Sequence, residues 1–243
     1  MRFAVIFTLA GLGLLALAVN LTAWWTRALG VDFGLVCLLL GAAYALNRPG
    51  FFLKSADGRI PFAGWLIYWV YFALNLAALR LFRARAGKQA FQLVAGNVWL
   101  GCRPDGSDAA TLQAVPIGAV LDLAAEFSES SFLRHGRNYR SLPILDTRAP
   151  TLAQLRSGVE FIEQEQQQHP IYVHCAIGHG RSACFVLAWL LRTHRVTSVE
   201  GGLKQLRDLR PGVGFYPEQH AVLVAFAADL KLSSPDNHAI LPS

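Results

Sequence analysis

Two long stretches without a charged residue set the first limit on how this chain can fold. Residues 3–26 and 60–79 contain only apolar and uncharged polar side chains. At about 1.5 Å of rise per residue, a helix of either stretch is long enough to cross a hydrocarbon layer about 30 Å thick. Residues 33–47 form a third, shorter apolar run that follows Asp32. The sequence therefore predicts an N-terminal membrane region, residues 1–92, with two or three hydrophobic helices.

A cleavable signal peptide is the alternative interpretation of the first stretch. Arg2 would supply its positive charge, and the Ala-Leu-Ala sequence of residues 16–18 fits a cleavage site. The uncharged stretch, however, continues through Trp24 and Trp25, which are typical of an aromatic anchor at a membrane surface. We therefore expect a retained membrane span.

The positive charges beside these stretches allow two arrangements in the membrane. If residues 3–26 and 28–47 cross and residues 60–79 lie at the surface, eight basic residues share one side against Arg27 alone. Those eight are Arg2, Arg48, Lys54, Arg59, Arg80, Arg83, Arg85 and Lys88. If all three stretches cross, the basic residues divide almost evenly, so the number of spans stays open. Both arrangements are compatible with an integral membrane protein whose catalytic domain is cytoplasmic, where thiols stay reduced.

The composition changes to that of an ordinary globular domain from about Gly96 onward, although the whole chain has only 16% charged residues. We predict one domain over residues 93–235 and a frayed tail over residues 236–243. Strands are expected at residues 97–101, 119–123 and 170–173, and another apolar run covers residues 139–145. Helices are expected at residues 107–115, 151–168, 182–192, 198–210 and 217–232. This alternation predicts an α/β fold whose central, mostly parallel sheet is flanked by helices.

Residues 174–182, with the sequence HCAIGHGRS, are the part of the chain with the most specific chemistry. They lie between the expected strand 170–173 and a helical pattern, so Cys175 is expected on a strand-to-helix turn. Main-chain N–H groups of residues 176–181 can surround one point there, and the positive end of the helix dipole faces it. Such sites lower the pKa of a thiol from about 8.5 to roughly 3.5–7.5. The guanidinium of Arg181 can hold two phosphoryl oxygens, so the motif predicts phosphate ester chemistry.

The motif resembles the His-Cys-x5-Arg-Ser/Thr signature of the cysteine-dependent protein tyrosine phosphatase superfamily, and it is most similar to the dual-specificity branch. The resemblance implies that Cys175 forms a phosphocysteine intermediate, that Ser182 helps the sulfur to leave and that His174 orders the loop. The implied phosphate-binding residues are Ala176, Ile177, Gly178, His179, Gly180 and Arg181. Gly178 and Gly180 are expected to allow positive φ and a close approach to the phosphate.

Asp146 is the predicted general acid. It ends the apolar run 139–145, begins a loop, and lies 29 positions before Cys175, which leaves room for one helix and a return strand. A carboxyl group on a loop facing the nucleophile can protonate the leaving oxygen and then activate the water that hydrolyses the intermediate. The spacing is also that of the dual-specificity family.

Several of these residues also have plainer interpretations. Cys175 can be a small core residue, Asp146 a turn or helix-cap residue, and Ser182 an ordinary first residue of a helix. Cys102 or Cys184 can resolve an oxidised Cys175 or simply pack in the core. In the family an acidic residue follows the second strand, and Glu126 is placed to match it or to be a solvated loop residue. The residues of 212–219 depart from the family's pattern, which puts a role for Gln219 in doubt.

The expected partners are anionic. The formal charge of +6 and the basic run at residues 80–88, directly after a hydrophobic stretch, predict contact with acidic lipid head groups. No cofactor and no metal are expected, because the chain has no CxxC pair, no HExxH motif and no carboxylate cluster in sequence. Nucleic acid is not an expected partner, since no known nucleic-acid-binding motif is present.

The sequence thus predicts a membrane-anchored phosphatase with a shallow pocket, acting on phosphotyrosine, phosphoserine or phosphothreonine in proteins. A lipid phosphate, such as phosphatidylglycerophosphate or a phosphoinositide, is the alternative substrate. An inactive, membrane-tethered phosphate-binding module would be expected to have lost the cysteine, arginine or aspartate, and none is lost. A sulfur-transfer or arsenate-reducing enzyme would not require Asp146.

Overall fold

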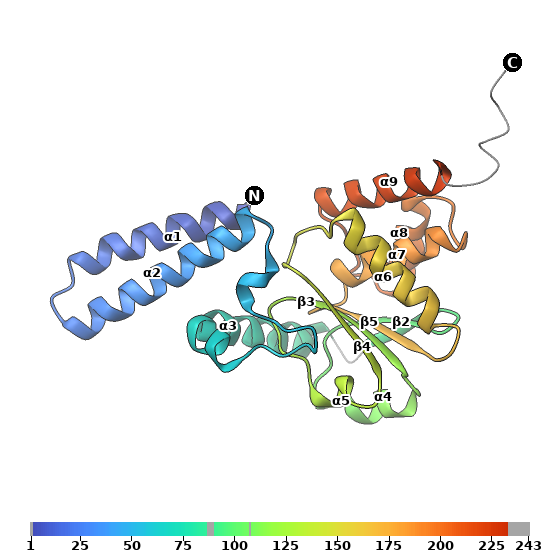
Figure 1. Ribbon diagram of the computed structural model, residues 1–243, viewed down its shortest axis with the longest axis horizontal. Coiled ribbons are helices and arrows are strands. Elements are labelled where there is room, and N and C mark those ends of the chain that lie inside the picture. Colours follow the sequence, from blue (N-terminus) through green and yellow to red (C-terminus); the bar gives the residue numbers. More distant parts are fainter. Residues whose placement is uncertain (1, 87–89, 107, 233–243) are drawn as a thin grey trace, which may run out of the picture.

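The computed structural model describes residues 2–86, 90–106 and 108–232, and it shows a helical hairpin and an α/β body connected by a long helix (Figure 1). The predicted tail, residues 236–243, lies outside the described residues. The elements are α1 (Arg2–Val19), α2 (Trp24–Ala45), the short 3-10 helix η1 (Pro49–Phe52), α3 (Phe62–Ala86), β1 (Phe91–Ala95), β2 (Val98–Gly101), α4 (Ala109–Ala114), β3 (Ala119–Ala124), α5 (Ser131–Arg134), β4 (Asn138–Ile144), α6 (Leu152–Glu165), β5 (Ile171–His174), α7 (Arg181–Arg192), α8 (Val199–Leu209) and α9 (Pro217–Leu232).

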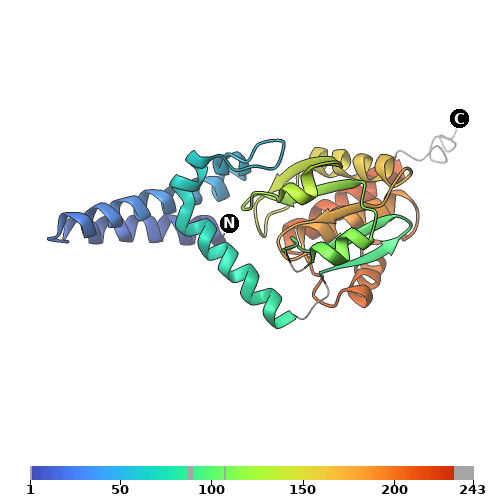
Figure 2. The ribbon, with the colours of Figure 1, turned by 90° about the horizontal axis from the view of Figure 1, so that it is seen from below.

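Helices α1 and α2 form an antiparallel hairpin that projects away from the body (Figure 2). Glycines let the two helices approach closely, since a Cβ on Gly11 would lie 2.8 Å from the carbonyl oxygen of Gly34. The uncharged stretch 3–26 is divided between two helices, so the candidate span that it contains ends at Val19 and not at residue 26. The amide of Asn20 donates to the carbonyl of Leu17 at 3.0 Å, and the chain turns before Trp24 begins α2.

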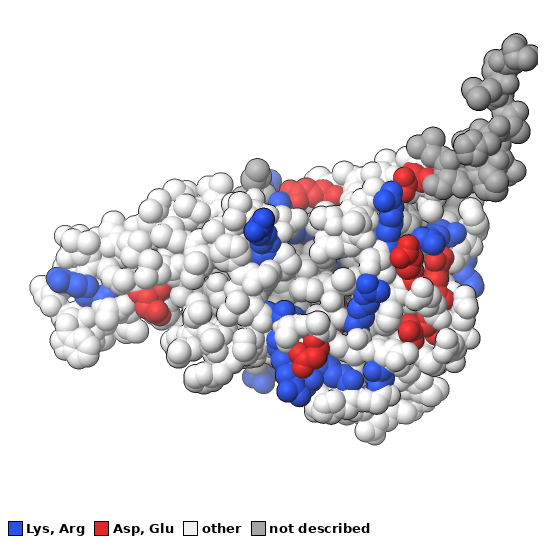
Figure 3. Space-filling model, viewed as in Figure 1, with Lys and Arg blue, Asp and Glu red and all other residues white. Residues whose placement is uncertain are grey.

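Within the described residues, three helices are long and apolar enough to cross a membrane: Arg2–Val19, Trp24–Ala45 and Phe62–Arg85. The first two are the arms of the hairpin, and their outward faces carry exposed apolar side chains such as Leu9 and Leu12. Helix α3 bends at Tyr68, whose φ of −107° and ψ of 20° are not helical. It runs across the direction of the hairpin, between the hairpin and the body (Figure 2). Figure 3 shows the visible face of the hairpin as mostly uncharged, with charges at its far tip and over the body.

The sheet of the body has the strand order β1-β2-β5-β3-β4. Strand β1, which the sequence did not suggest, pairs with β2 in antiparallel fashion, and the other three pairs are parallel, so the predicted mostly parallel sheet is confirmed. Helices α6 to α9 cover one face, and the short helices α4 and α5 cover the other (Figure 1). Helix α7 is central to the fold, because residues 181–191 are all buried.

The carboxyl ends of β3, β4 and β5 meet at one edge of the sheet, where ligands bind in open α/β folds. This topology brings the loops that follow Ala124, Ile144 and His174 together. The N-terminal helices pack against the same edge through one apolar cluster. In that cluster Tyr44 of α2 and Phe52 of η1 lie with Ala125 and Leu145, the residues that directly follow β3 and β4.

Candidate active site

The cysteine loop connects β5 to α7, as the sequence predicted. Cys175 is 2% exposed and forms part of the floor of a pocket of about 380 Å³. Its Sγ lies 3.3 Å from the Oγ of Ser182, at the start of α7. The burial of Cys175 therefore does not remove it from the site, because the sulfur borders the pocket and a hydroxyl group.

Two contacts fix the path of the loop. The amide of Arg103 donates to the carbonyl of Ala176 at 2.9 Å, which ties the loop to the chain after β2. Gly178 has a φ of +75°, and a Cβ there would lie 2.5 Å from the carbonyl oxygen of Gly101, so a side chain would clash. Gly180 does not follow the same expectation, since its φ is −113°. The close approach at Gly180 is to Gln219, whose Oε1 would lie 3.4 Å from an added Cβ.

The guanidinium of Arg181 is held in place by acidic groups. Its Nη1 and Nη2 donate to the two carboxylate oxygens of Glu126, both at 2.7 Å, and Nη1 also donates to the carbonyl of Ile144 at 2.9 Å. Burial alone would lower the pKa of Arg181, but Glu126 and Asp146 raise it well above the ordinary value. The structure thus gives Glu126 a definite place, as the partner that orients a permanently charged arginine at the pocket.

Asp146 lies at the rim of the same pocket. Its Oδ1 is 3.0 Å from Nη2 of Arg181, and its side chain is 56% exposed, so it faces both the pocket and solvent. The next residue, Thr147, has a φ of +63°, which is an unfavourable conformation for a β-branched residue. The carboxylate of Asp146 and the sulfur of Cys175 thus line the same pocket.

Other parts of the chain complete the pocket. His179, Arg207, Tyr216 and Gln219 line it. Gln219 is fully buried, and its Nε2 donates to the carbonyl of Arg148 at 3.0 Å, so it joins the 212–219 segment to the loop of Asp146. The role of Gln219, which the sequence left in doubt, is thus to line the pocket, and nothing in the local sequence around Arg207 indicated that Arg207 lines it too.

His179, Cys102 and Cys184 are the remaining histidine and cysteine residues that the sequence singled out. Burial and the charge of Arg210 lower the pKa of His179 to about 4, so this side chain is neutral at pH 7. Cys102 and Cys184 are both buried, and burial raises the pKa of each thiol. Cys184 lies in the main core of the body. These surroundings favour the core interpretation of both thiols over a redox role.

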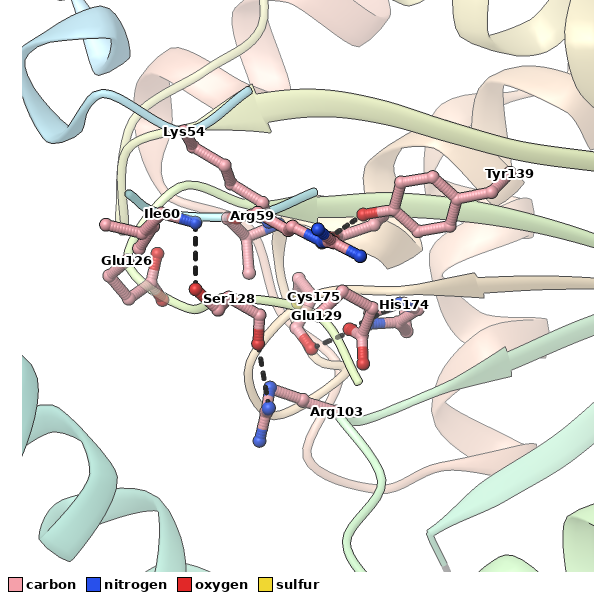
Figure 4. A network of polar contacts seen from close by, with 12 residues as sticks. Lys54, Arg59, Ile60, Arg103, Glu126, Ser128, Glu129, Tyr139, His174 and Cys175 are labelled. Atoms are coloured by element: carbon pink, nitrogen blue, oxygen red, sulfur yellow. Dashed lines mark hydrogen bonds and ion pairs between the residues drawn. The ribbon is translucent and has the colours of Figure 1, made fainter. Parts of the chain in front are cut away.

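Behind the cysteine loop lies a cluster of buried polar residues (Figure 4). His174 is fully buried, and its Nε2 is 3.4 Å from Oε2 of Glu129. The donor atoms of Asp122, Glu129 and His174 lie within 4.8 Å of one another, a set that could hold a metal ion by its chemistry. The ammonium group of Lys54 already contacts Asp122 at 2.6 Å, which places a cation at this cluster.

Comparison with known proteins gives a consistent family. The family model described as dual specificity phosphatase, catalytic domain, matches residues 98–228. The phosphatidylglycerophosphate phosphatase PTPMT2 of Arabidopsis thaliana is 26% identical over 189 residues, which cover 75% of this chain and 77% of the relative. The phosphatidylglycerophosphatase and protein-tyrosine phosphatase 1 of Mus musculus is 33% identical over 92 residues, 37% of this chain, and the chain spans about half (47%) of that relative's length.

Solved structures agree with the sequence comparisons. The crystal structure of PTPMT1 in complex with PI(5)P matches with a TM-score of 0.52 and 25% identity, covering 59% of this chain and 97% of that structure. The crystal structure of Tk-PTP in the active form matches with a TM-score of 0.52 and 26% identity, covering 57% of this chain and 97% of that structure. The family model matches more than half of the chain, and the cysteine loop, Arg181 and Asp146 line one pocket. The protein therefore belongs to the dual specificity phosphatase family.

Proposed function

We propose that this phosphatase is anchored in a membrane and removes a phosphate monoester from a membrane lipid through a phosphocysteine intermediate. The observation that carries the chemistry is the meeting of Cys175, Arg181 and Asp146 at one pocket. In the first step the sulfur of Cys175 attacks phosphorus and the bond to the lipid oxygen breaks. Asp146 gives its proton to that oxygen, while Arg181 and the amides of the loop hold the phosphoryl oxygens.

The second step returns the enzyme to its starting state. Asp146, now a carboxylate, takes a proton from a water molecule that attacks the phosphocysteine. The bond between phosphorus and sulfur breaks, and inorganic phosphate leaves. The hydroxyl of Ser182, 3.3 Å from Sγ, is placed to donate a hydrogen bond to the sulfur as negative charge returns to it.

A second hollow beside the pocket favours a lipid as the substrate. This hollow of about 300 Å³ shares Thr147 and Tyr216 with the phosphate pocket. Its other side is formed by Phe3, Ala4 and Tyr44, at the ends of α1 and α2 nearest the body. A phosphate held over Cys175 would therefore have the rest of its molecule beside helices suited to a membrane, which matches a phospholipid head group. The names of the Arabidopsis and mouse relatives, which refer to phosphatidylglycerophosphate, support the same class of substrate.

A phosphoprotein is the second candidate. The name of the mouse relative includes protein-tyrosine phosphatase, and the pocket opens to solvent beside the exposed side chain of Tyr216. A phosphorylated side chain on a membrane-bound partner would reach Cys175 by the same opening.

We further propose how the chain lies in the membrane. The hairpin α1–α2 crosses the hydrocarbon layer and returns, and α3 lies near the surface, because it runs across the hairpin between the hairpin and the body (Figure 2). The exposed Arg80 and Arg85 near the end of α3 then meet acidic head groups on the same side as the body, whereas Arg83 pairs with Asp108 of the body at 2.6 Å. In this arrangement residues 1–92 form the membrane region, residues 93–235 contain the catalytic sheet, and the body lies in the cytoplasm.

The test compares substrates with the intact chain in lipid nanodiscs. Release of phosphate from phosphatidylglycerophosphate and from phosphatidylinositol 5-phosphate in vesicles is measured against release from phosphotyrosine peptides, without added metal. We expect a higher kcat/KM for the lipids. A preference for the peptides would contradict the lipid assignment, and turnover that survives Asp146→Asn unchanged would favour a thiol enzyme that needs no general acid.

A further inference from the structure

Lys54 belongs to the membrane region in sequence, but its side chain ends inside the α/β body (Figure 4). It lies between η1 and α3, in the linker formed by residues 53–60. Its ammonium nitrogen is 2.6 Å from Oδ2 of Asp122 and 2.5 Å from the carbonyl oxygen of Ala124, and its side chain is 1% exposed. A lysine this deeply buried is rare unless it is paired.

The cluster around Lys54 needs a positive charge. Asp122 is fully buried, and it also accepts hydrogen bonds from the hydroxyl of Tyr139 on β4, at 2.6 Å, and from the amide of Ala124, at 3.0 Å. The carboxylate of Glu129 and the imidazole of His174 complete the group of titratable side chains that face Asp122. Two buried carboxylates without a cation would be strongly destabilising.

Burial and the neighbouring groups shift the pKa of Asp122 in opposite directions. Burial alone raises it, but the charges of Lys54 and His174 and the hydrogen bonds from Lys54 and Tyr139 outweigh burial and hold it below the ordinary value. Lys54 therefore belongs to the set of groups that keep Asp122 ionised inside the body.

The same linker is connected to the cysteine loop by main-chain contacts. In the sheet, Asp122 pairs with His174, the residue before Cys175. The carbonyl of Gly58 accepts from the amide of Glu129 at 2.8 Å, and the amide of Ile60 donates to Oγ of Ser128 at 2.9 Å.

The route continues from that segment to the loop itself. The carbonyl of Ser128 accepts from Nη2 of Arg103 at 2.8 Å, and the amide of Arg103 donates to the carbonyl of Ala176 at 2.9 Å. Figure 4 shows the linker, the 126–129 segment and the cysteine loop lying next to one another. The linker thus contacts Asp122, the sheet partner of His174, and also Ser128, whose carbonyl accepts from the Arg103 that holds the loop at Ala176.

We propose that Lys54 is a positioning residue for the phosphate-binding loop, and that its side chain is part of the catalytic unit although it comes from the linker. Its ammonium group is the internal cation that lets Asp122 and Glu129 remain behind His174 and Cys175. The catalytic unit then begins about forty residues before the sheet, and the membrane region and the active site fold as one piece. This inference rests on the proposed role of Cys175 for its effect on activity, but its effect on stability is independent of that role.

The experiment uses the full chain in detergent, with Lys54→Met and a control in the same linker, Arg59→Met. Arg59 pairs with Asp57 at the surface, where both side chains are more than half exposed, so its loss should change little. We expect Lys54→Met to lower kcat on a soluble aryl phosphate by roughly tenfold to a hundredfold, because a displaced loop misplaces the sulfur. Thermal unfolding should occur at a lower temperature than in the parent.

The pH dependence separates a charge effect from a loss of packing. In the parent, the lowered pKa of Asp122 gives stability that is present above about pH 4 and is lost as the pH falls through the folded-state pKa. Without Lys54, burial disfavours the Asp122 anion, so the loss of stability should be large at pH 7 and shrink as the pH falls to about 4. A loss caused by packing alone would be similar at both pH values and would contradict the proposal.

A second substitution in the same chain keeps the test decisive if Lys54→Met unfolds. Adding Asp122→Asn removes the unpaired anion, and we expect the double variant to regain a large part of the lost stability and kcat. A double variant no better than Lys54→Met would overturn the proposal, as would an Lys54→Met variant with unchanged kcat and unfolding temperature. If Cys175→Ser proved active, the proposed chemistry would fail while the recovery of stability would still test Lys54.

Discussion

Helices α1 and α7 are both rich in apolar residues, but the protein uses them in opposite ways. In α7, residues 181–191 are all buried, packed between the sheet and its neighbouring helices. In α1, the buried residues are Ala4, Gly11 and Ala18, and the larger side chains face outward. Small residues inside and large apolar residues outside are what a helix needs in lipid, whereas the reverse holds in water. The apolar content of a helix therefore does not by itself distinguish a lipid environment from a protein core. The face on which the small residues lie does distinguish them.

The candidate active site lies where these two kinds of structure meet. Ala125 and Leu145, next to Glu126 and Asp146, pack in the same apolar cluster as residues of α2, η1 and α3. The edge of the sheet that carries the candidate site is thus covered by the N-terminal helices and not by solvent alone. If this arrangement decides function, the chemistry depends on residues of the α/β body. The choice of substrate then depends on the junction, the hollow between the body and the ends of α1 and α2.

The largest effect is expected for Cys175→Ser. If chemistry belongs entirely to the body, this change should lower turnover of every substrate by roughly four orders of magnitude or more, since the nucleophile is lost. The measurement is phosphate release from a soluble aryl phosphate and from vesicle lipid with the same protein preparation. Comparable unfolding temperatures for the parent and the variant would serve as the control, and residual turnover on lipid alone would point to a second site.

A smaller loss is expected for Asp146→Asn, about a hundredfold to ten-thousandfold in kcat, because proton transfer to the leaving oxygen is removed. The loss should be greater for a lipid phosphate, whose alkoxide is a poor leaving group, than for an aryl phosphate with an acidic phenol. Equal losses for both substrates would argue that Asp146 acts through Arg181, 3.0 Å away, and not as the acid.

Phe3→Ser tests the junction itself. Phe3 lines the hollow beside the phosphate pocket, whereas Val5, also exposed on α1, does not line it, so Val5→Ser is the matched control. We expect the KM for lipid to rise about tenfold with Phe3→Ser, since losing part of an aromatic contact costs about 1–2 kcal/mol. Turnover of the aryl phosphate should not change. If both substitutions raised the KM for lipid equally, the effect would come from altered membrane insertion, and the hollow would not be part of the substrate site.

The smallest effect is expected for His179→Gln. The pKa of His179 is lowered to about 4 in the folded protein, below the ordinary value for histidine, so the unfolded chain binds more protons between about pH 4 and 6.5. The parent should therefore lose stability as the pH falls through this window, and His179→Gln should lose less. Unfolding temperatures from pH 7 to pH 4.5 check this. Parallel curves for the two proteins would contradict the half-buried, neutral state of His179.

The parts of the site that could be predicted from sequence are those encoded within one short segment. The loop from His174 to Ser182 carries its nucleophile, arginine and helix start together, and Asp146 follows an apolar run at a characteristic spacing. Glu126, left between two interpretations, pairs with Arg181 across 55 positions, and Lys54 reaches Asp122 across 68. A buried ion pair between distant residues leaves no local pattern, because each partner alone resembles a solvated charge.

The errors in the predicted fold have the same origin. The break between α1 and α2 falls in uncharged residues, so composition did not show it, and it depends on main-chain contacts such as the one from Asn20 to Leu17. Gly180 has a negative φ and lies beside Gln219, a residue of another helix that the local sequence does not bring near. Strand β1 exists because β2 offers it an edge, and its own five residues are only partly buried.

The most direct test of the account is to trap the intermediate. The Asp146→Asn chain is mixed with a lipid phosphate or an aryl phosphate, quenched in acid, digested and analysed by mass spectrometry. The account predicts one phosphoryl group on the peptide that contains Cys175, and none when Cys175 is also replaced by serine. A phosphoryl group on any other residue, or product formed with no phosphorylated peptide in a burst of turnover, would contradict a phosphocysteine mechanism.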